Sequence, residues 1–368
     1  MKMPSAAASS VLLVLAVGAA TARAADDRTY RVVDVAAGVH AFIAGESTSG
    51  FVSGNSVAIV GRDGVLVVDS GHVPAMTRLM IEDIRRWTDR PVRYLVSTHW
   101  HPDHTAGDGE YRKAFPGLVH IATSNAARQV ESVQHYLTRT SAALPGYRRT
   151  LEERLQSNSG RDGQPLSDRD RRLFAAQLRD IDGAATAFAE ARVDPPDVTF
   201  EHDLTVDLGD RVVRVVHPGR GNTAGDAVVY VPDAKVLVTG DLLVLPTPYA
   251  IGSFLGDWIG ATGALLAYDA AALVPGHGDV QHDGKALRDL GELLRAVVAQ
   301  VAEAVKTGAS LDDVRKAVTL ESFRDRYAGD DGARRQAFDD YFVTPGIERA
   351  FLEAKFVLGG ESVVINGK

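Results

Sequence analysis

The sequence contains no cysteine among its 368 residues. This absence excludes a disulfide framework, a thiolate zinc site, an iron–sulfur cluster and a cysteine nucleophile. Positive charge is also in the minority, because 40 Lys and Arg stand against 48 Asp and Glu. An acidic chain is a poor partner for nucleic acid or for an anionic membrane surface. With 35 Gly and 15 Pro, the composition is not that of a collagen-like or low-complexity protein. A chain of this length can bury a large core without disulfide or structural-metal support.

Long apolar runs are lacking except near the N-terminus, where Val11–Ala20 spans ten residues. A membrane-crossing helix needs about 20 such residues. Lys2 precedes the run, and the small-x-small triplet Ala22-Arg23-Ala24 follows it. This order predicts a secretory signal peptide over residues 1–24, and therefore a periplasmic or secreted protein, with a membrane anchor or a buried N-terminal helix as the alternative. Cleavage would remove Lys2 and Arg23, leaving 38 basic and 48 acidic residues and a net charge of −10.

Hydrophobic periodicity predicts a mixed α/β chain. Residues 74–90 have helical spacing, because Met76, Met80, Ile84 and Trp87 fall on one face. Short β-branched runs bounded by Gly or Pro predict strands. These strands are Val39–Ala44, Ser56–Val60, Val65–Val68, Val92–Val96, Leu118–Ala122, Val198–Phe200, Leu204–Leu208, Val212–Val216, Ala227–Val231, Val236–Thr239 and Ala271–Val274.

Two regions have a helical character. Residues 125–192 are rich in Ala, Leu, Arg and Glu, and we interpret them as an insertion of two or three helices. Pro145 and the Ser157–Pro165 stretch are expected to break these helices, and Ser167 has the pattern of a helix N-cap. After residue 285, Leu287, Leu290, Leu294, Val297 and Val301 predict an amphipathic helix that ends at Gly308, with more helix to about Phe356. The expected units are therefore a domain over 25–285 and a helical segment over 286–368, in an α/β layered sandwich.

The strongest chemical signal follows directly on the predicted strand Val92–Val96. Four side chains that can bind a metal lie within six residues, and three of the eleven histidines are among them. They are His99, His101, Asp103 and His104. His99 and His101 are two residues apart, so on an extended segment they point the same way. Three imidazoles beside a carboxylate are a typical zinc set. Asp241 and His277, which each follow a short apolar strand, are further candidate ligands at strand ends.

The motif His99-x-His101-x-Asp103-His104 resembles the signature of the metallo-β-lactamase superfamily. Other segments resemble its remaining motifs in order: Val65–Gly71 with Asp69, Thr239-Gly240-Asp241, and Pro275–Gly278 with His277. The resemblance runs from about Val32 to His282 without the helical insertion, and it implies a four-layer αβ/βα sandwich. It also implies that Asp241 bridges two metal ions and that His277 is the last ligand. We interpret Asp69 as a residue that supports a ligand by hydrogen bonding, rather than as a ligand.

One motif departs from the family pattern. In the segment His217–Asp226, the position where the family usually has a metal-binding His is Asn222. An amide oxygen is a harder and weaker zinc ligand than imidazole, so the site of His99 and His101 is expected to be the weaker of two. Three readings stay open: Asn222 binds a weaker first metal, His217 replaces it, or only the second site of Asp103, His104, Asp241 and His277 fills tightly. Arg220, in the same Gly-rich loop, is a candidate for binding a substrate carboxylate as a bidentate fork, with a structural surface Arg as the alternative.

The resemblance implies an exported zinc-dependent hydrolase with one or two ions per chain. Its small-molecule substrate would be a cyclic amide, lactone, ester or thioester, and a β-lactam is one such case. In this role Asp103 orients the nucleophile and accepts its proton. The alternatives are a catalytically weak metal- or ligand-binding protein of the same fold, and a mononuclear iron oxygenase using two His and a carboxylate. The oligomeric state and the role of the insertion are left open, although the loop Pro246–Asp257 is expected to line the substrate cleft.

Overall fold

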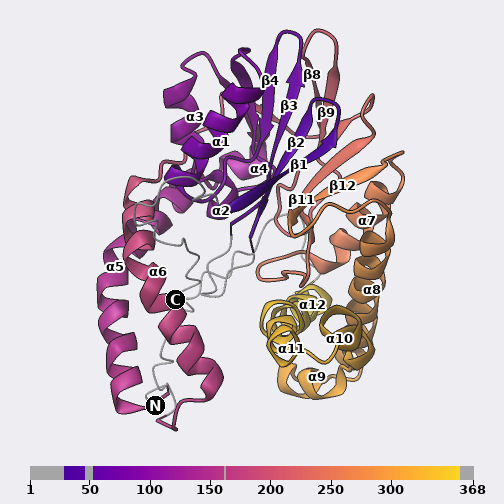
Figure 1. The fold of residues 1–368 in the computed structure, drawn as a ribbon. Coiled ribbons are helices and arrows are strands. Elements are labelled where there is room, and N and C mark those ends of the chain that lie inside the picture. Colours follow the sequence, from indigo (N-terminus) through magenta and orange to yellow (C-terminus); the bar gives the residue numbers. More distant parts are fainter. Residues whose placement is uncertain (1–28, 46–52, 161–162, 357–368) are drawn as a thin grey trace.

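Two β-sheets form the centre of the computed structural model, which describes residues 29–45, 53–160 and 163–356 (Figure 1). The predicted signal peptide lies outside these residues. Within them, the first sheet has the order β1-β2-β3-β4-β5-β6-β7 and the second β12-β11-β10-β9-β8. The strands of the first sheet are β1 (Tyr30–Ala36), β2 (Val39–Ala44), β3 (Ser56–Gly61), β4 (Gly64–Val68), β5 (Val92–Val96), β6 (Val119–Thr123) and β7 (Val198–Phe200). Those of the second are β8 (Asp203–Asp207), β9 (Val212–Val216), β10 (Val228–Val231), β11 (Val236–Val244) and β12 (Ala272–His277).

Alternating side chains on β4 explain how the layers pack. Leu66 and Val68 join the core between the two sheets, whereas Val65 and Val67 join the core under the outer helices. A strand buried on both faces in this way is apolar throughout, since neighbouring side chains point to opposite faces. The outer face of the first sheet is covered by α1 (Pro74–Trp87) and α3 (Asp108–Ala114). The first sheet and these helices are two of the four predicted layers.

The outer face of the second sheet is covered by helices that follow it in sequence. α7 (Leu255–Leu266) and α8 (Lys285–Lys306) pack on it, so the predicted four-layer αβ/βα sandwich is confirmed. The helices that follow α8 join the same apolar cluster. These are α9 (Leu311–Ala317), α10 (Glu321–Ala328), α11 (Gly332–Phe338), the π-helical turn η1 (Asp339–Val343) and α12 (Thr344–Phe356). Among them, α9 and α12 are in direct contact with α8. The sequence pattern does not indicate α7, because Gly256, Gly260 and Gly263 lower its helix propensity.

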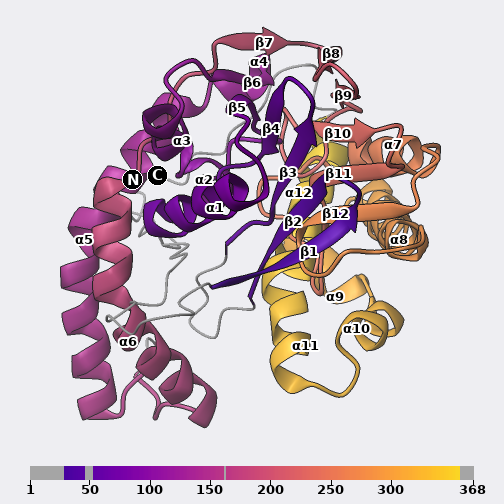
Figure 2. The same cartoon turned by 45° about the horizontal axis from the view of Figure 1, so that its top comes forward.

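The insertion is a pair of long helices joined to the first sheet by α4 (Ser124–Ala127). α5 (Val130–Ser157) and α6 (Asp168–Glu190) lie side by side and extend away from the sheets (Figures 1 and 2). The predicted break at Pro145 is wrong, because α5 continues through it. Burial of Leu144 and Leu151 against α6 outweighs the one backbone hydrogen bond that proline removes. Ser167 caps α6 as predicted, since its side chain accepts the N–H of Asp170.

A membrane span requires a helix that is both long and apolar. Among the described residues, no helix combines the length and the apolar content needed to cross a bilayer.

Candidate metal centre

The histidine cluster lies where β5 meets two short helices. β5 ends at Val96, and the chain then continues through His99 and His101 into α2 (Pro102–Thr105). Asp103 and His104 are therefore on the first turn of a helix, and His101 is its extended N-cap residue. His99 lies in a bend before it, and not on the extended segment that the sequence predicts. His99, Asp103 and His104 are all buried. The cluster is thus part of the packed interior at the end of the strand and not an exposed polar loop.

Asp241 and His277 come from neighbouring parallel strands of the second sheet. The expectation that they follow their strands is wrong, because Asp241 lies inside β11 and His277 is the last residue of β12. The pairing is irregular at Gly240, whose positive φ of 52° suits glycine. A Cβ atom at Gly276 would lie 2.0 Å from an oxygen of Asp241. The two glycines therefore give the Asp241 carboxylate room to face the histidines.

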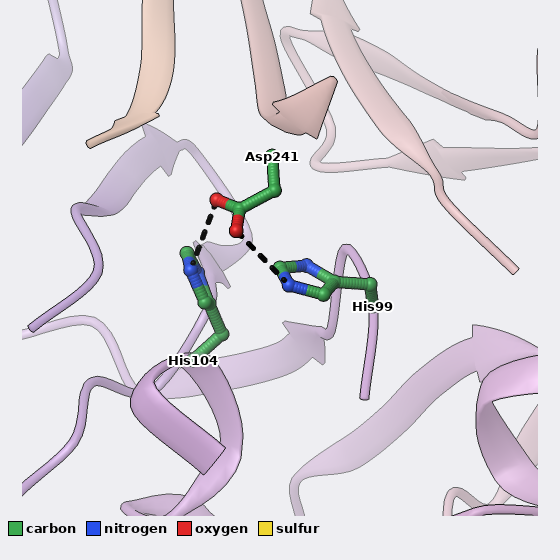
Figure 3. A group of neighbouring side chains, drawn as sticks. All are labelled: His99, His104 and Asp241. Carbon is green, nitrogen blue, oxygen red and sulfur yellow. Dashed lines mark ion pairs between the residues drawn. The ribbon is translucent and has the colours of Figure 1, made fainter. Parts of the chain in front are cut away.

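The Asp241 carboxylate lies between His99 and His104, with one oxygen toward each (Figure 3). His101 lies on the side of His99 and His277 on the side of His104, which gives two groups of histidines. Asp241 Oδ2 is 3.5 Å from His99 Nε2 and 3.9 Å from His101 Nδ1. Its Oδ1 is 3.2 Å from His104 Nε2 and 3.5 Å from His277 Nε2. Asp103 belongs to the second group, because its Oδ2 is 3.0 Å from His277 Nε2 and 3.3 Å from His104 Nε2. This arrangement is that of a carboxylate able to bridge two ions.

The donor atoms fit a metal centre. Two sets of three have all ligand atoms within 4.8 Å of one another: His99, His104 and Asp241, and Asp103, His104 and His277. His101 lies beside His99, with its Nδ1 only 2.9 Å from His99 Nε2, so these two rings form the group that faces Asp241 Oδ2. Asp241 Oδ1 is buried without a hydrogen-bond partner among the described residues. The ring of His104 lies 3.2 Å from this oxygen as an ion pair, but without the geometry of a hydrogen bond. A buried carboxylate oxygen needs a direct partner, and a metal ion bound by these side chains would supply it.

Asp69 holds His104 in position from behind. Its Oδ2 is 2.9 Å from His104 Nδ1, and it also accepts hydrogen bonds from the hydroxyl and the backbone N–H of Thr98. With Nδ1 engaged, His104 directs Nε2 toward Asp103 and Asp241. Asp69 thus has the geometry predicted for a residue that supports a ligand and is not itself one.

Burial and charge set the protonation of the cluster. Burial lowers the pKa of His99 to about 4, against the attraction of Asp241. Burial also opposes the charged form of His104, but the carboxylates of Asp103, Asp241 and Asp69 outweigh it and raise the pKa of His104 well above its usual value. For Asp103 and Asp241, burial favours the neutral form, but the neighbouring histidines hold both pKa values well below the usual range. Both carboxylates are therefore ionised, as metal ligands must be.

The third motif forms a tight loop beside the cluster. Asn222 is buried, and its amide nitrogen donates to the backbone carbonyl of Tyr249 at 2.9 Å. Its Oδ1 is buried with no hydrogen-bond partner in the described part of the chain. Asp226 shapes the loop by accepting the N–H and the hydroxyl of Thr223. The Nδ1 atom of His217 lies 2.6 Å from the backbone carbonyl oxygen of Asp226. His217 belongs to neither of the two sets of clustered ligand atoms described above.

A cleft of about 1550 Å³ opens onto the candidate ligands. His101, Asp103, Asn222, Asp241 and His277 lie in its wall. The loop after β11 contributes as predicted, and the structure adds walls from α5 and from the C-terminal helices, which the sequence pattern does not indicate. Lining residues from these segments include Val133, Tyr136, Pro246, Thr247, Tyr249, Ile251, Phe254, Tyr341, Arg349, Phe351 and Leu352.

Arg220 is held by neighbours of its own. Its Nε donates to Asp257 at 2.5 Å, and its guanidinium carbon lies 4.6 Å from the centre of the Phe254 ring. It is not among the residues that line the cleft. Its predicted role toward a substrate carboxylate stays a prediction.

Comparisons with known proteins agree on one family. The family model of the metallo-beta-lactamase superfamily matches residues 49–277. A linear primary-alkylsulfatase of Pseudomonas sp. (strain ATCC 19151) is 24% identical over 248 residues, which cover 65% of this chain and 44% of that protein. The chain therefore corresponds to less than half of this curated relative.

Solved structures show the same fold at low identity. The stereoselective inverting sec-alkylsulfatase Pisa1 from Pseudomonas sp. superposes with a TM-score of 0.61 and 16% identity, over 91% of this chain and 51% of that one. A metallo-beta-lactamase from Pontibacter korlensis superposes with a TM-score of 0.51 and 22% identity, over 72% of this chain and 99% of that one.

Proposed function

The chain belongs to the metallo-beta-lactamase superfamily, and from this premise we propose that it is a zinc-dependent hydrolase of esters that carry a large apolar group. The observation that carries the proposal is the Asp241 carboxylate, which presents one oxygen to His99 and the other to His104. The first group would consist of His99, His101 and Asp241 with the Asn222 oxygen, and the second of Asp103, His104, Asp241 and His277.

The side chains of the cluster have different roles in the proposed hydrolysis. A zinc ion held by these side chains would supply a water molecule whose pKa is lowered to about 7 and a positive charge near the scissile group. Asp103, ionised and in contact with His104 and His277, orients the attacking water and accepts its proton. Asp69 fixes the ring of His104. His99 is fully buried, so bulk water does not compete for its ring nitrogens. The protein thus supplies position and charge before substrate binds.

The cleft supports the substrate class. Its volume of about 1550 Å³ and its lining by Val244, Ile251 and Phe351 suit a long or bulky apolar group. The relative in Pseudomonas sp. is a linear primary-alkylsulfatase, so we add alkyl sulfate esters to the carbonyl esters, lactones, thioesters and β-lactams predicted from the sequence. We place alkyl sulfates and long-chain carboxylic esters first, because a small cyclic amide would leave most of this cleft empty.

The test is a substrate panel run with and without a chelator. It contains alkyl sulfates and p-nitrophenyl esters of short and long chain, a lactone and a β-lactam. We expect turnover that increases with chain length, is lost on chelation and returns with zinc. A turnover rate that is the same with and without the chelator would contradict the proposal. Iron in the purified protein would favour an oxygenase, and absence of bound metal would favour a binding protein.

Export is also part of the proposal. We expect the mature protein to begin at about Ala25, because a charged N-terminus, an apolar run and an A-x-A site occur in order. N-terminal sequencing of protein from the periplasm or medium tests this expectation. Recovery of soluble protein that retains Met1 would contradict it.

Replacement of Asn222 by His is expected to tighten binding of the weaker zinc ion. The reason is that imidazole is a better zinc ligand than an amide oxygen, and Asn222 Oδ1 is already buried without a donor. The measurement is competitive zinc titration of both proteins, which should show two unequal steps in the native chain. Asn222→Gln, which keeps the amide, is the control. Two equally tight steps that Asn222→His leaves unchanged would place Asn222 away from the metal.

Zinc binding is expected to release protons at pH 7. Because the pKa of His104 is raised in the metal-free cluster, its ring is charged there and must lose about one proton to become a ligand. The release should decline, and the affinity increase, as the pH rises through the pKa of His104. Calorimetry in two buffers of different ionisation enthalpy measures the number of protons. Asp69→Asn removes one carboxylate that raises this pKa, so its release should be smaller, whereas equal heats in both buffers would contradict the prediction.

A further inference from the structure

Arg349 is a buried cation in the wall of the same cleft. It lies on α12, beyond the segment that matches the family model, and only 8% of it is exposed. Its Nε donates to the backbone carbonyl of Ser253 at 2.6 Å. Its guanidinium carbon is 5.3 Å from the centre of the Phe254 ring. These contacts fix the side chain while its two terminal nitrogens remain without a hydrogen-bond partner among the described residues.

No carboxylate forms a close ion pair with Arg349 in the described part of the chain, although the charge of the nearby Glu353 raises its pKa against the effect of burial. Glu353, one turn further along α12, directs its two oxygens to the backbone N–H groups of Leu255 and Gly256, each at 2.9 Å. Glu353 therefore caps α7 instead of pairing with Arg349. The other cleft-lining cations in the described residues do have acidic partners. These pairs are Arg31–Asp279, Lys285–Asp289, Arg326–Glu292 and Arg334–Asp331.

An unpaired guanidinium in this position is costly by itself. Burial lowers the pKa of Arg349, which reflects the loss of water around the charge. Burying a charge is unfavourable unless it is paired and hydrogen-bonded. The free edge of a guanidinium matches the two oxygens of a carboxylate or a sulfate. An anion in the cleft would therefore supply the partner that the chain does not.

We propose that Arg349 binds an anionic group of the substrate and so, within the ester class proposed above, makes the enzyme prefer amphiphilic anions such as alkyl sulfates to neutral esters. The inference rests on the proposed function, since it assumes that the cleft receives the substrate. It assigns a recognition role to the C-terminal helices, whereas the candidate metal ligands all lie within residues 99–277. Carboxylate and sulfate share the required chemistry, and the experiment separates them.

Arg220 is the competing guanidinium. It contacts the same Phe254 ring, but Asp257 neutralises it, and its side chain is outside the cleft lining. The structure thus gives the two arginines different expected effects on anion binding, and replacing each in turn distinguishes them.

The experiment measures binding and does not require turnover. Isothermal titration uses decanoate, decyl sulfate and the neutral decyl maltoside, all below their micelle concentrations. In Arg349→Ala we expect affinity for both anions to fall about 10- to 100-fold, the range of one lost hydrogen-bonded charge contact, with decyl maltoside unchanged. A loss for only one anion would identify which oxyanion Arg349 recognises. Because metal ions also attract anions, the titrations are repeated on chelated protein, where the loss should persist.

Control variants separate recognition from structure. Arg349→Lys keeps the charge without the fork and should retain part of the anion preference; it also serves as the test variant if Arg349→Ala does not fold. Glu353→Gln disturbs the same contact between α12 and α7 but leaves the guanidinium, so it should keep the preference. Equal losses for anions and maltoside, or a preference that disappears in Arg220→Ala and not in the Arg349 variants, would overturn the proposal. Failure of the substrate panel would not, because binding is measured independently.

Discussion

Replacing Asp241 by Asn is expected to lower zinc affinity at both groups of ligands and to abolish measurable hydrolysis. Asp241 is the residue whose two oxygens face the two groups, at 3.5 Å from His99 and 3.2 Å from His104. Asparagine keeps the size of the side chain but removes its charge and turns one oxygen into a donor. Mutation of a residue that only supports a ligand typically lowers metal affinity about 10- to 100-fold. For Asp241→Asn, which changes a ligand itself, we expect zinc affinity to fall by more than about 100-fold.

The measurement is zinc content and titration of the purified Asp241→Asn protein. Asp69→Asn is the matched comparison, because Asp69 contacts His104 but neither His99 nor His101 directly. We expect Asp69→Asn to weaken the second group alone, whereas Asp241→Asn weakens both. If Asp241→Asn retains two tightly bound ions, the bridging role is wrong. If only one step of the titration changes, Asp241 serves a single ion.

Asp103→Asn is expected to lower kcat even when zinc is saturating. Asp103 is the one carboxylate inside the histidine motif, and its Oδ2 contacts both His277 and His104. Its loss should weaken the second metal and also remove the group that orients the attacking water. Loss of a general base typically costs about 10²–10⁴-fold, which corresponds to roughly 3–5 kcal/mol of activation free energy.

Rising zinc concentration separates the two effects of Asp103→Asn. Activity should recover in part, as the second site refills, and then level off far below the native kcat. His99→Ala is the control, because it weakens the first site without removing a proton acceptor, and its kcat should recover further. Complete recovery of Asp103→Asn would make Asp103 a ligand only, and its catalytic role would be wrong.

The layers of the fold and the clustering of the ligands could be predicted because both depend on local pattern. β-branched runs such as that of β4 are apolar on both faces, and this marks strands buried between two layers. His99, His101, Asp103 and His104 are adjacent in sequence, so their proximity in space follows almost directly. Asp241 and His277 could be added because each follows a short apolar run in the sequence and belongs to a segment that resembles a family motif.

The features that could not be predicted depend on contacts between distant segments. The continuity of α5 through Pro145 needs the packing of α6, which is not visible in the local sequence. The position of Asp241 inside β11 depends on the space left by Gly276 on the neighbouring strand. Arg349 is held in the wall of the cleft by a hydrogen bond to the backbone carbonyl of Ser253, 96 residues earlier. No spacing rule connects such pairs, because their proximity is a property of the folded chain.

Besides the candidate ligands, the wall of the cleft includes the start of α5, the loop after β11 and the C-terminal helices. None of the candidate metal ligands lies on α5 or on the C-terminal helices. Mutations that reshape these two walls therefore leave the ligands in place. In evolution, this separation lets selection alter what the protein recognises without rebuilding how it reacts. For the same reason, a library confined to these helices is a direct way to search for new substrates in the laboratory.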